Sequence, residues 1–150
     1  MKKNILTKSP EETKKLGKNI ALKILKSGPK KRALVIGLEG DLGTGKTVFL
    51  QGFAKGLGIT EKVLSPTFIL IRRFFLHHKS FKNFYHIDCY RLESEKDVEV
   101  LNLGGMLSNP LNIITIEWSE KIKRVLPKDI IRLSFKHLEE NKREIVFDKF

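Results

Sequence analysis

The chain has 150 residues, of which 41% are hydrophobic and 31% are charged. This composition is too apolar for a disordered chain, and a chain of this length folds as one compact domain that buries roughly 70% of its unfolded surface. No apolar run approaches the roughly 20 residues of a membrane-spanning helix. The basic first residues lack the apolar core of a signal peptide, and Cys89 is the single cysteine. We therefore expect one globular domain, located in the cytoplasm and without a membrane segment.

Lysine and arginine number 29 against 17 aspartates and glutamates, which gives a net charge of +12. A field of this sign attracts nucleic acid, nucleotides or acidic proteins. The same excess is also typical of a lysine-rich surface that is simply solvated. Charge alone therefore does not choose among these partners.

The first predicted helix begins at residues 9–12, which read Ser-Pro-Glu-Glu. Here the serine can cap the helix, proline fits its first position and the second glutamate can reach back to the cap. Leu16, Ile20 and Ile24 then recur every four residues and predict one buried face, which continues to Gly28-Pro29. This helix is expected to serve packing.

The next elements are a buried strand, a glycine-rich turn and a second helix. Residues 33–38 form a short apolar run, which is typical of a strand covered on both faces. Apolar spacing predicts the helix over residues 45–57, and Gly56 and Gly58 offer the left-handed positions that helix ends often require.

Further strands are predicted at residues 68–71, 84–88 and 112–117, and a β-hairpin is predicted from 130–135 and 144–147 around a polar turn. The expected fold class is therefore α/β, with a mixed, partly parallel sheet flanked by helices and a C-terminal β-hairpin.

Residues 40–47, GDLGTGKT, match the phosphate-binding pattern G-x-x-x-x-G-K-[ST] between a predicted strand and a predicted helix. Glycines allow several backbone N–H groups to point at one anion, the lysine reaches the terminal phosphates and the threonine can ligate Mg²⁺. The pattern predicts a P-loop NTPase domain. The residues expected to contact the nucleotide are Asp41, Leu42, Gly43, Thr44, Gly45, Lys46, Thr47 and Val48.

ATP is the expected nucleotide. The Asn-Lys-x-Asp element with which GTPases bind guanine is missing, and its nearest string, residues 141–144, ends in glutamate and lies in the predicted hairpin. GTP is the less favoured alternative.

A P-loop enzyme needs a further acidic group to hold Mg²⁺ directly or through water. Asp88 and Glu117 each end a predicted buried strand, so that both can emerge at the carboxyl edge where such sheets bind ligands. Both also fit a plainer interpretation as solvated carboxylates at strand ends.

Two other residues are candidates for the site. Thr67, in Ser65-Pro66-Thr67, can face the γ-phosphate as a switch threonine does, although a proline-containing turn produces the same letters. His86 shares its strand face with Asp88 and can orient a carboxylate or donate to phosphate, although a lone histidine on a strand is more often a packed or surface group.

Four motifs follow one another along the chain: GDLGTGKT (40–47), SPTF (65–68), HIDCYRL (86–92) and IEWSE (116–120). Through these motifs the chain resembles the TsaE (YjeE) family of P-loop ATPases, which assist threonylcarbamoyladenosine formation on tRNA in bacteria. The similarity extends from about residue 9 to the C-terminal hairpin. In this chain Thr44 replaces a frequent alanine. Asn102 replaces a frequent glycine, at a turn where asparagine tolerates the left-handed backbone.

The resemblance implies a role for each motif. Lys46 and the loop amides hold the phosphates, Thr47 and Glu117 help to bind Mg²⁺, and Asp88 and Thr67 complete the hydrolytic site. It also implies the partners: the TsaD–TsaB complex, in which TsaD carries out the transfer onto tRNA, while this chain supplies slow ATP turnover. Direct contact with tRNA is left open.

Two other functions remain as alternatives. A small-molecule P-loop kinase would use Arg72-Arg73 as lid or acceptor-binding cations. A basic RNA-binding protein with a regulatory nucleotide site would use that pair together with Lys30-Lys31-Arg32. The stretch 72–82 follows no pattern that predicts an element.

Overall fold

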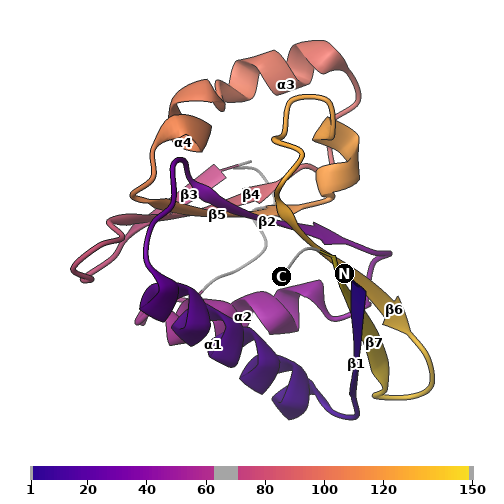
Figure 1. Ribbon diagram of the computed structural model, residues 1–150. Helices are drawn as coiled ribbons and strands as arrows, with labels where there is room; N and C mark the ends of the chain where they lie inside the picture. The colour runs from indigo at the N-terminus through magenta and orange to yellow at the C-terminus, as the bar shows by residue number, and fades with distance from the viewer. Residues whose placement is uncertain (1, 63–70, 149–150) are drawn as a thin grey trace.

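The structure is a computed structural model that describes residues 2–62 and 71–148. One seven-stranded sheet, of order β1-β7-β6-β2-β5-β4-β3, forms its centre (Figure 1). The strands are β1 (Lys2–Thr7), β2 (Leu34–Glu39), β3 (Ile71–Phe75), β4 (Asn83–Asp88), β5 (Asn112–Glu117), β6 (Ile131–His137) and β7 (Arg143–Asp148). The helices are α1 (Pro10–Ser27), α2 (Lys46–Gly56), α3 (Glu95–Leu101) and α4 (Gly104–Ser108), with a 3-10 turn η1 (Ser119–Ile122).

The middle of the sheet is parallel and its margins are antiparallel. Strand β2 pairs in parallel with β5 and β6, and β5 pairs in parallel with β4. Strands β3, β7 and β1 are added antiparallel, and β6 with β7 forms the predicted hairpin. The predicted mixed sheet is confirmed. Its parallel part brings the carboxyl ends of β2, β4 and β5 to one edge.

Helices cover both faces of the sheet. Helices α1 and α2 lie on one face, and α3, α4 and η1 lie on the other (Figure 1). The first face has a core rich in phenylalanine, including Phe49, Phe53 and Phe84, whereas the second is mainly aliphatic, with Ile87 and Ile116 among its buried residues. Among the described residues, no helix is both long enough and apolar enough to span a membrane.

Helix α1 begins and ends close to the predicted residues. The Ser9 hydroxyl accepts from the Glu12 backbone N–H at 3.1 Å, as predicted. The Glu12 carboxylate accepts from the backbone N–H of Lys8 at 2.7 Å, one residue before the cap Ser9 that it was predicted to reach. Ile20 and Ile24 are buried, and Gly28 ends the helix with φ 79°.

Glycines bring α1 and α2 into backbone contact. A Cβ on Gly52 would overlap the Lys14 carbonyl of α1, and one on Gly56 would lie 2.7 Å from the Ala21 side chain. The left-handed conformation predicted for Gly56 is therefore wrong, because this residue is part of helix α2. Glycine is needed there because a side chain would not fit against α1. Gly58, with φ 85°, does adopt the left-handed conformation.

Strands β1 and β3 depart from the sequence predictions. Most residues of β1 are exposed, so no apolar pattern in the sequence indicates this strand. Its backbone is held instead by antiparallel pairing with β7. Of the strand predicted over residues 68–71, only Ile71 lies within the described residues, and β3 extends from it to Phe75, into the stretch without a predicted element. Asn102, which ends α3, has the expected left-handed backbone, with φ 49°.

Candidate nucleotide-binding site

The loop between β2 and α2 is curled by glycine. Gly40, Gly43 and Gly45 have φ of 137°, 77° and 101°, a conformation that glycine adopts without a steric cost. Thr44 tightens the curl, because its hydroxyl donates to the Asp41 carbonyl at 2.7 Å. The predicted strand, loop and helix are confirmed, and the loop leads directly into the N-terminus of α2.

Lys46 is the first residue of α2, and its side chain is folded back over the loop. The residue is 5% exposed, its ammonium donates to the Gly40 carbonyl, and Nζ lies 4.0 Å from the centroid of the Trp118 ring. Burial lowers the pKa of Lys46, and the carboxylates of Glu117, Glu120, Asp88 and Asp41 act in the opposite direction. A compact cationic centre thus lies among acidic groups.

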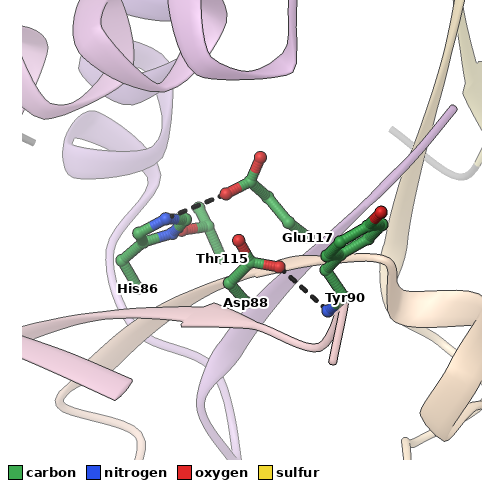
Figure 2. Close-up of polar contacts among 5 residues, drawn as sticks. All are labelled: His86, Asp88, Tyr90, Thr115 and Glu117. Carbon is green, nitrogen blue, oxygen red and sulfur yellow. Dashed lines mark hydrogen bonds and ion pairs between the residues drawn. The ribbon is translucent and has the colours of Figure 1, made fainter. Parts of the chain in front are cut away.

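Asp88 and Glu117 meet at the carboxyl edge of the sheet. They are the last residues of β4 and β5, and they are paired in the register of these parallel strands. Both carboxyl groups rise on the same side of the strands (Figure 2). Glu117 is 4% exposed, whereas Asp88 is half-buried and accepts from the Tyr90 N–H at 3.0 Å. Both residues therefore lie at the carboxyl edge, as predicted, and the order and register of β4 and β5 place them side by side.

His86 lies against Glu117 rather than in open solvent. Its Nε2 is 3.1 Å from Glu117 Oε2, and its Nδ1 is 3.2 Å from the Thr115 hydroxyl (Figure 2). When the threonine O–H donates to Nδ1, the ring proton lies on Nε2, where it faces the Glu117 carboxylate without the geometry of a hydrogen bond. Of the roles predicted for His86, the geometry favours orientation of a carboxylate.

The acidic edge has the donors that a magnesium ion bound with a nucleotide requires. Oε2 of Glu117 is buried, and it accepts no hydrogen bond from the described residues despite its ion-pair distance to His86. The described residues contain no group of three or more His, Cys, Asp or Glu side chains able to hold a metal. Mg²⁺ typically takes one or two carboxylates together with phosphates and water, so Glu117 and the exposed Thr47 fit it.

Trp118 is a contact of Lys46 that the residue pattern alone did not assign. The residue follows Glu117 with a left-handed backbone of φ 59°. Its backbone N–H donates to the Leu38 carbonyl at 2.9 Å. Its ring centroid lies 5.3 Å from that of Tyr90. The sequence feature that could have indicated this role is the position of Trp118 directly after Glu117, a carboxylate that ends a buried strand.

The other predicted residues differ in how accessible they are. Thr44 is buried, Gly45 and Val48 are half-buried, and the exposed members of the loop are Asp41, Leu42, Gly43 and Thr47. Thr67 and the tripeptide 65–67 lie outside the described residues.

Cys89, next to Asp88, is not a chemical member of the site. The side chain is buried, and burial, followed by the charge of Asp88, raises the pKa of its thiol to about 12. A thiol that holds its proton so strongly is a poor nucleophile near neutral pH, so Cys89 serves packing.

Comparison with known proteins gives one family. The profile described as "Threonylcarbamoyl adenosine biosynthesis protein TsaE" matches residues 7–145. A Bacillus subtilis (strain 168) protein described as tRNA threonylcarbamoyladenosine biosynthesis protein TsaE is 39% identical over 141 residues, which cover 94% of this chain and 82% of that protein.

Proteins with the same description occur in Rickettsia bellii and Treponema pallidum. They are 37% and 32% identical to this chain, and the matches cover 90% and 93% of this chain and 87% and 96% of theirs. The crystal structure of YdiB from Bacillus subtilis superimposes with a TM-score of 0.73 at 31% identity, over 98% of this chain and 84% of that one.

Proposed function

The chain belongs to the TsaE family, a family of P-loop ATPase type, and from this premise we propose that it binds Mg²⁺-ATP and hydrolyses it slowly in support of threonylcarbamoyladenosine synthesis on tRNA. The observation that carries the proposal is the arrangement of Lys46, Asp88 and Glu117. These residues meet where the parallel strands end, beside a loop curled by glycines. This is the edge at which open α/β sheets bind their ligands.

Each side chain has a distinct task in the proposal. The loop N–H groups and the Lys46 ammonium bind the phosphates, whose negative charge replaces the Gly40 carbonyl as the partner of the ammonium. Glu117, positioned by His86, accepts hydrogen bonds from water through its unsatisfied oxygen. Asp88 lies beside it and helps to orient the attacking water, with Thr67 assigned to the same step by resemblance alone.

Magnesium completes this proposal. When bound, Mg²⁺ would neutralise charge that develops on the phosphates during transfer. Thr47 and Glu117 are the residues that would hold it, because a hydroxyl at the start of the helix and one buried carboxylate are hard oxygen donors.

The proposed partners follow from the family resemblance. A TsaD–TsaB complex would carry out the transfer onto tRNA in the cytoplasm, and its docking would raise an otherwise slow rate of ATP hydrolysis. The net charge of +12 suits a position close to an acidic protein surface or to tRNA.

The test of this function is ATP hydrolysis by the purified chain, measured alone and with TsaD–TsaB and tRNA. We expect slow turnover alone and an increase of at least about tenfold with the complex, because partner docking would order the groups that place the water. A control reaction uses the Lys46→Ala variant with the same partners.

A rate that the complex does not change would contradict partner activation. Fast transfer of phosphate to a small-molecule acceptor, without any protein partner, would instead favour the kinase alternative.

Conservative changes at the acidic edge are expected to separate binding from hydrolysis. Glu117→Gln and Asp88→Asn should each lower the rate of hydrolysis about 10²–10³-fold, since each removes a preorganised charge at the reacting phosphate. ATP affinity should change much less, because the loop and Lys46 stay intact. Equilibrium binding and single-turnover hydrolysis measure the two effects. Normal hydrolysis by both variants would remove these residues from the site.

Trp118 gives a direct signal for nucleotide binding. It is the single tryptophan of the chain, and the Lys46 ammonium lies over its ring. Phosphates that draw this cation away should change the tryptophan emission, since a cation interacts strongly with the ring. We expect a saturable change with ATP, a weaker response at equal GTP, and none in Lys46→Ala. An equal response to both nucleotides would contradict the preference for ATP.

A further inference from the structure

A cavity lies at the end of the sheet opposite the nucleotide loop. It has a volume of about 610 Å³, within the range of ligand pockets, and lies between the end of α1, the start of β2 and the segment before β6. Pairing of β2 with β6 begins at Ile36 and Ile131. The preceding residues Leu34 and Val35 therefore border an opening where β6 has not yet begun.

The inner wall of this cavity is aliphatic. Ile24, Val35 and Ile130 line it and are each less than 5% exposed. Among the described residues, no aromatic side chain contributes to the lining. Such a wall favours an apolar side chain and offers no surface on which a nucleic-acid base can stack.

The rim of the cavity is strongly basic. Lys23, Lys30, Lys31 and Arg32 all lie on it and are exposed. The acidic member is Asp129, which is 3.5 Å from Arg32 in an exposed ion pair. Exposed pairs of this kind are weak, because water screens them, so a competing carboxylate can replace Asp129.

We propose that this cavity binds an acidic segment of a partner protein, with one or two apolar side chains on the aliphatic wall and flanking aspartates or glutamates on the basic rim. Charge complementarity and the apolar interior together favour this occupant over RNA, whose phosphates would gain nothing from the wall. The cluster Lys30-Lys31-Arg32, considered above as an RNA contact, acquires a protein-binding role.

This interaction is separate from nucleotide binding. The cavity adjoins the first residues of β2, whereas the phosphate loop follows its last residue, Glu39. A partner held at the cavity therefore leaves the phosphate loop accessible, and the proposal does not rest on ATP hydrolysis.

The test uses the full chain and a fluorescein-labelled pool of short peptides, in which two apolar residues of varied identity lie between aspartates and glutamates. Fluorescence anisotropy should give an affinity at least tenfold higher than for a pool of equal charge in which serine replaces the apolar residues. A uridylate oligonucleotide serves as the competing polyanion.

Matched variants locate the site. Lys30→Glu/Lys31→Glu should weaken peptide binding at least tenfold. Lys14→Glu/Lys15→Glu, which makes the same charge change on exposed residues of α1 outside the cavity, should weaken it less than threefold. Ser27→Phe narrows the cavity without a change of charge and should also lower the affinity, while circular dichroism and thermal unfolding verify the fold. Lys46→Ala should bind the peptides normally.

Several results would overturn the proposal. They are the absence of peptide binding, equal affinity for the serine pool, equal losses in the two double variants, or dependence of RNA binding rather than peptide binding on Lys30 and Lys31. Peptide binding and ATP hydrolysis are measured separately on the unchanged chain and on Lys46→Ala, so failure here is distinguishable from failure of the proposed ATPase function.

Discussion

Replacement of Lys46 with alanine is expected to lower ATP turnover about 10²–10³-fold, with the fold retained. The side chain supplies a cation that interacts with Glu117 and Asp88, and the loop N–H groups cannot replace its full charge next to the phosphates. The fold should survive, because the ammonium contacts the Gly40 carbonyl and the Trp118 ring without being part of either apolar core. Single-turnover hydrolysis and thermal unfolding measure the two effects.

Lys55→Ala is the matched control for this variant. Lys55 lies in the last turn of the same helix and is exposed, so its replacement removes the same charge far from the phosphate loop. The control should hydrolyse ATP within about twofold of the unchanged protein, since exposed charges are well screened. Equal losses in the two variants would indicate an effect of net charge, and undiminished turnover in Lys46→Ala would contradict the assigned role.

Replacement of Gly52 with alanine is expected to destabilise the protein by about 1–3 kcal/mol or more, the range found for overpacked interiors. The added Cβ would overlap the Lys14 carbonyl, and this neighbour is backbone that cannot rotate away. Helices α1 and α2 must then separate. Urea unfolding should show a lower midpoint with an unchanged slope, because the surface exposed on unfolding stays similar.

Gly104→Ala is the comparison for Gly52→Ala. Gly104 begins the short helix α4, and a Cβ there has no neighbour within 4 Å among the described residues. Alanine is the better helix former, so this variant should be neutral or slightly more stable. If Gly52→Ala unfolded at the same denaturant concentration as Gly104→Ala, close contact between α1 and α2 would not limit stability.

The sequence was most informative where burial is strongest. Strands β2 and β5 were predicted within one residue of their observed ends, because a strand covered on both faces needs a nearly continuous apolar run. Strand β1 carries no such signal, since its exposed side chains contribute little and its backbone pairs at the sheet margin. Gly56 was misassigned because the same residue type serves both left-handed turns and close helix contacts.

The candidate site was predictable in part. The rule that ligands lie at the carboxyl edge of parallel strands was enough to place Asp88 and Glu117 at that edge. Their position side by side depends on the order and register of β4 and β5. The contact of His86 with Glu117 depends on the register that sets His86 opposite Thr115. The position of Lys46 against Gly40 and Trp118 depends on how the loop and the end of β5 approach each other, which no local pattern encodes.

The buried position of Lys46 links nucleotide affinity to proton uptake. In the free protein, burial holds the pKa of Lys46 below its ordinary value. Bound phosphates add negative charge next to the ammonium and raise that pKa again. Above the lowered pKa, the free lysine is largely neutral and must gain a proton when the nucleotide binds. As the pH rises, the affinity for ATP therefore begins to fall at a lower pH than it would if the lysine of the loop were exposed to solvent.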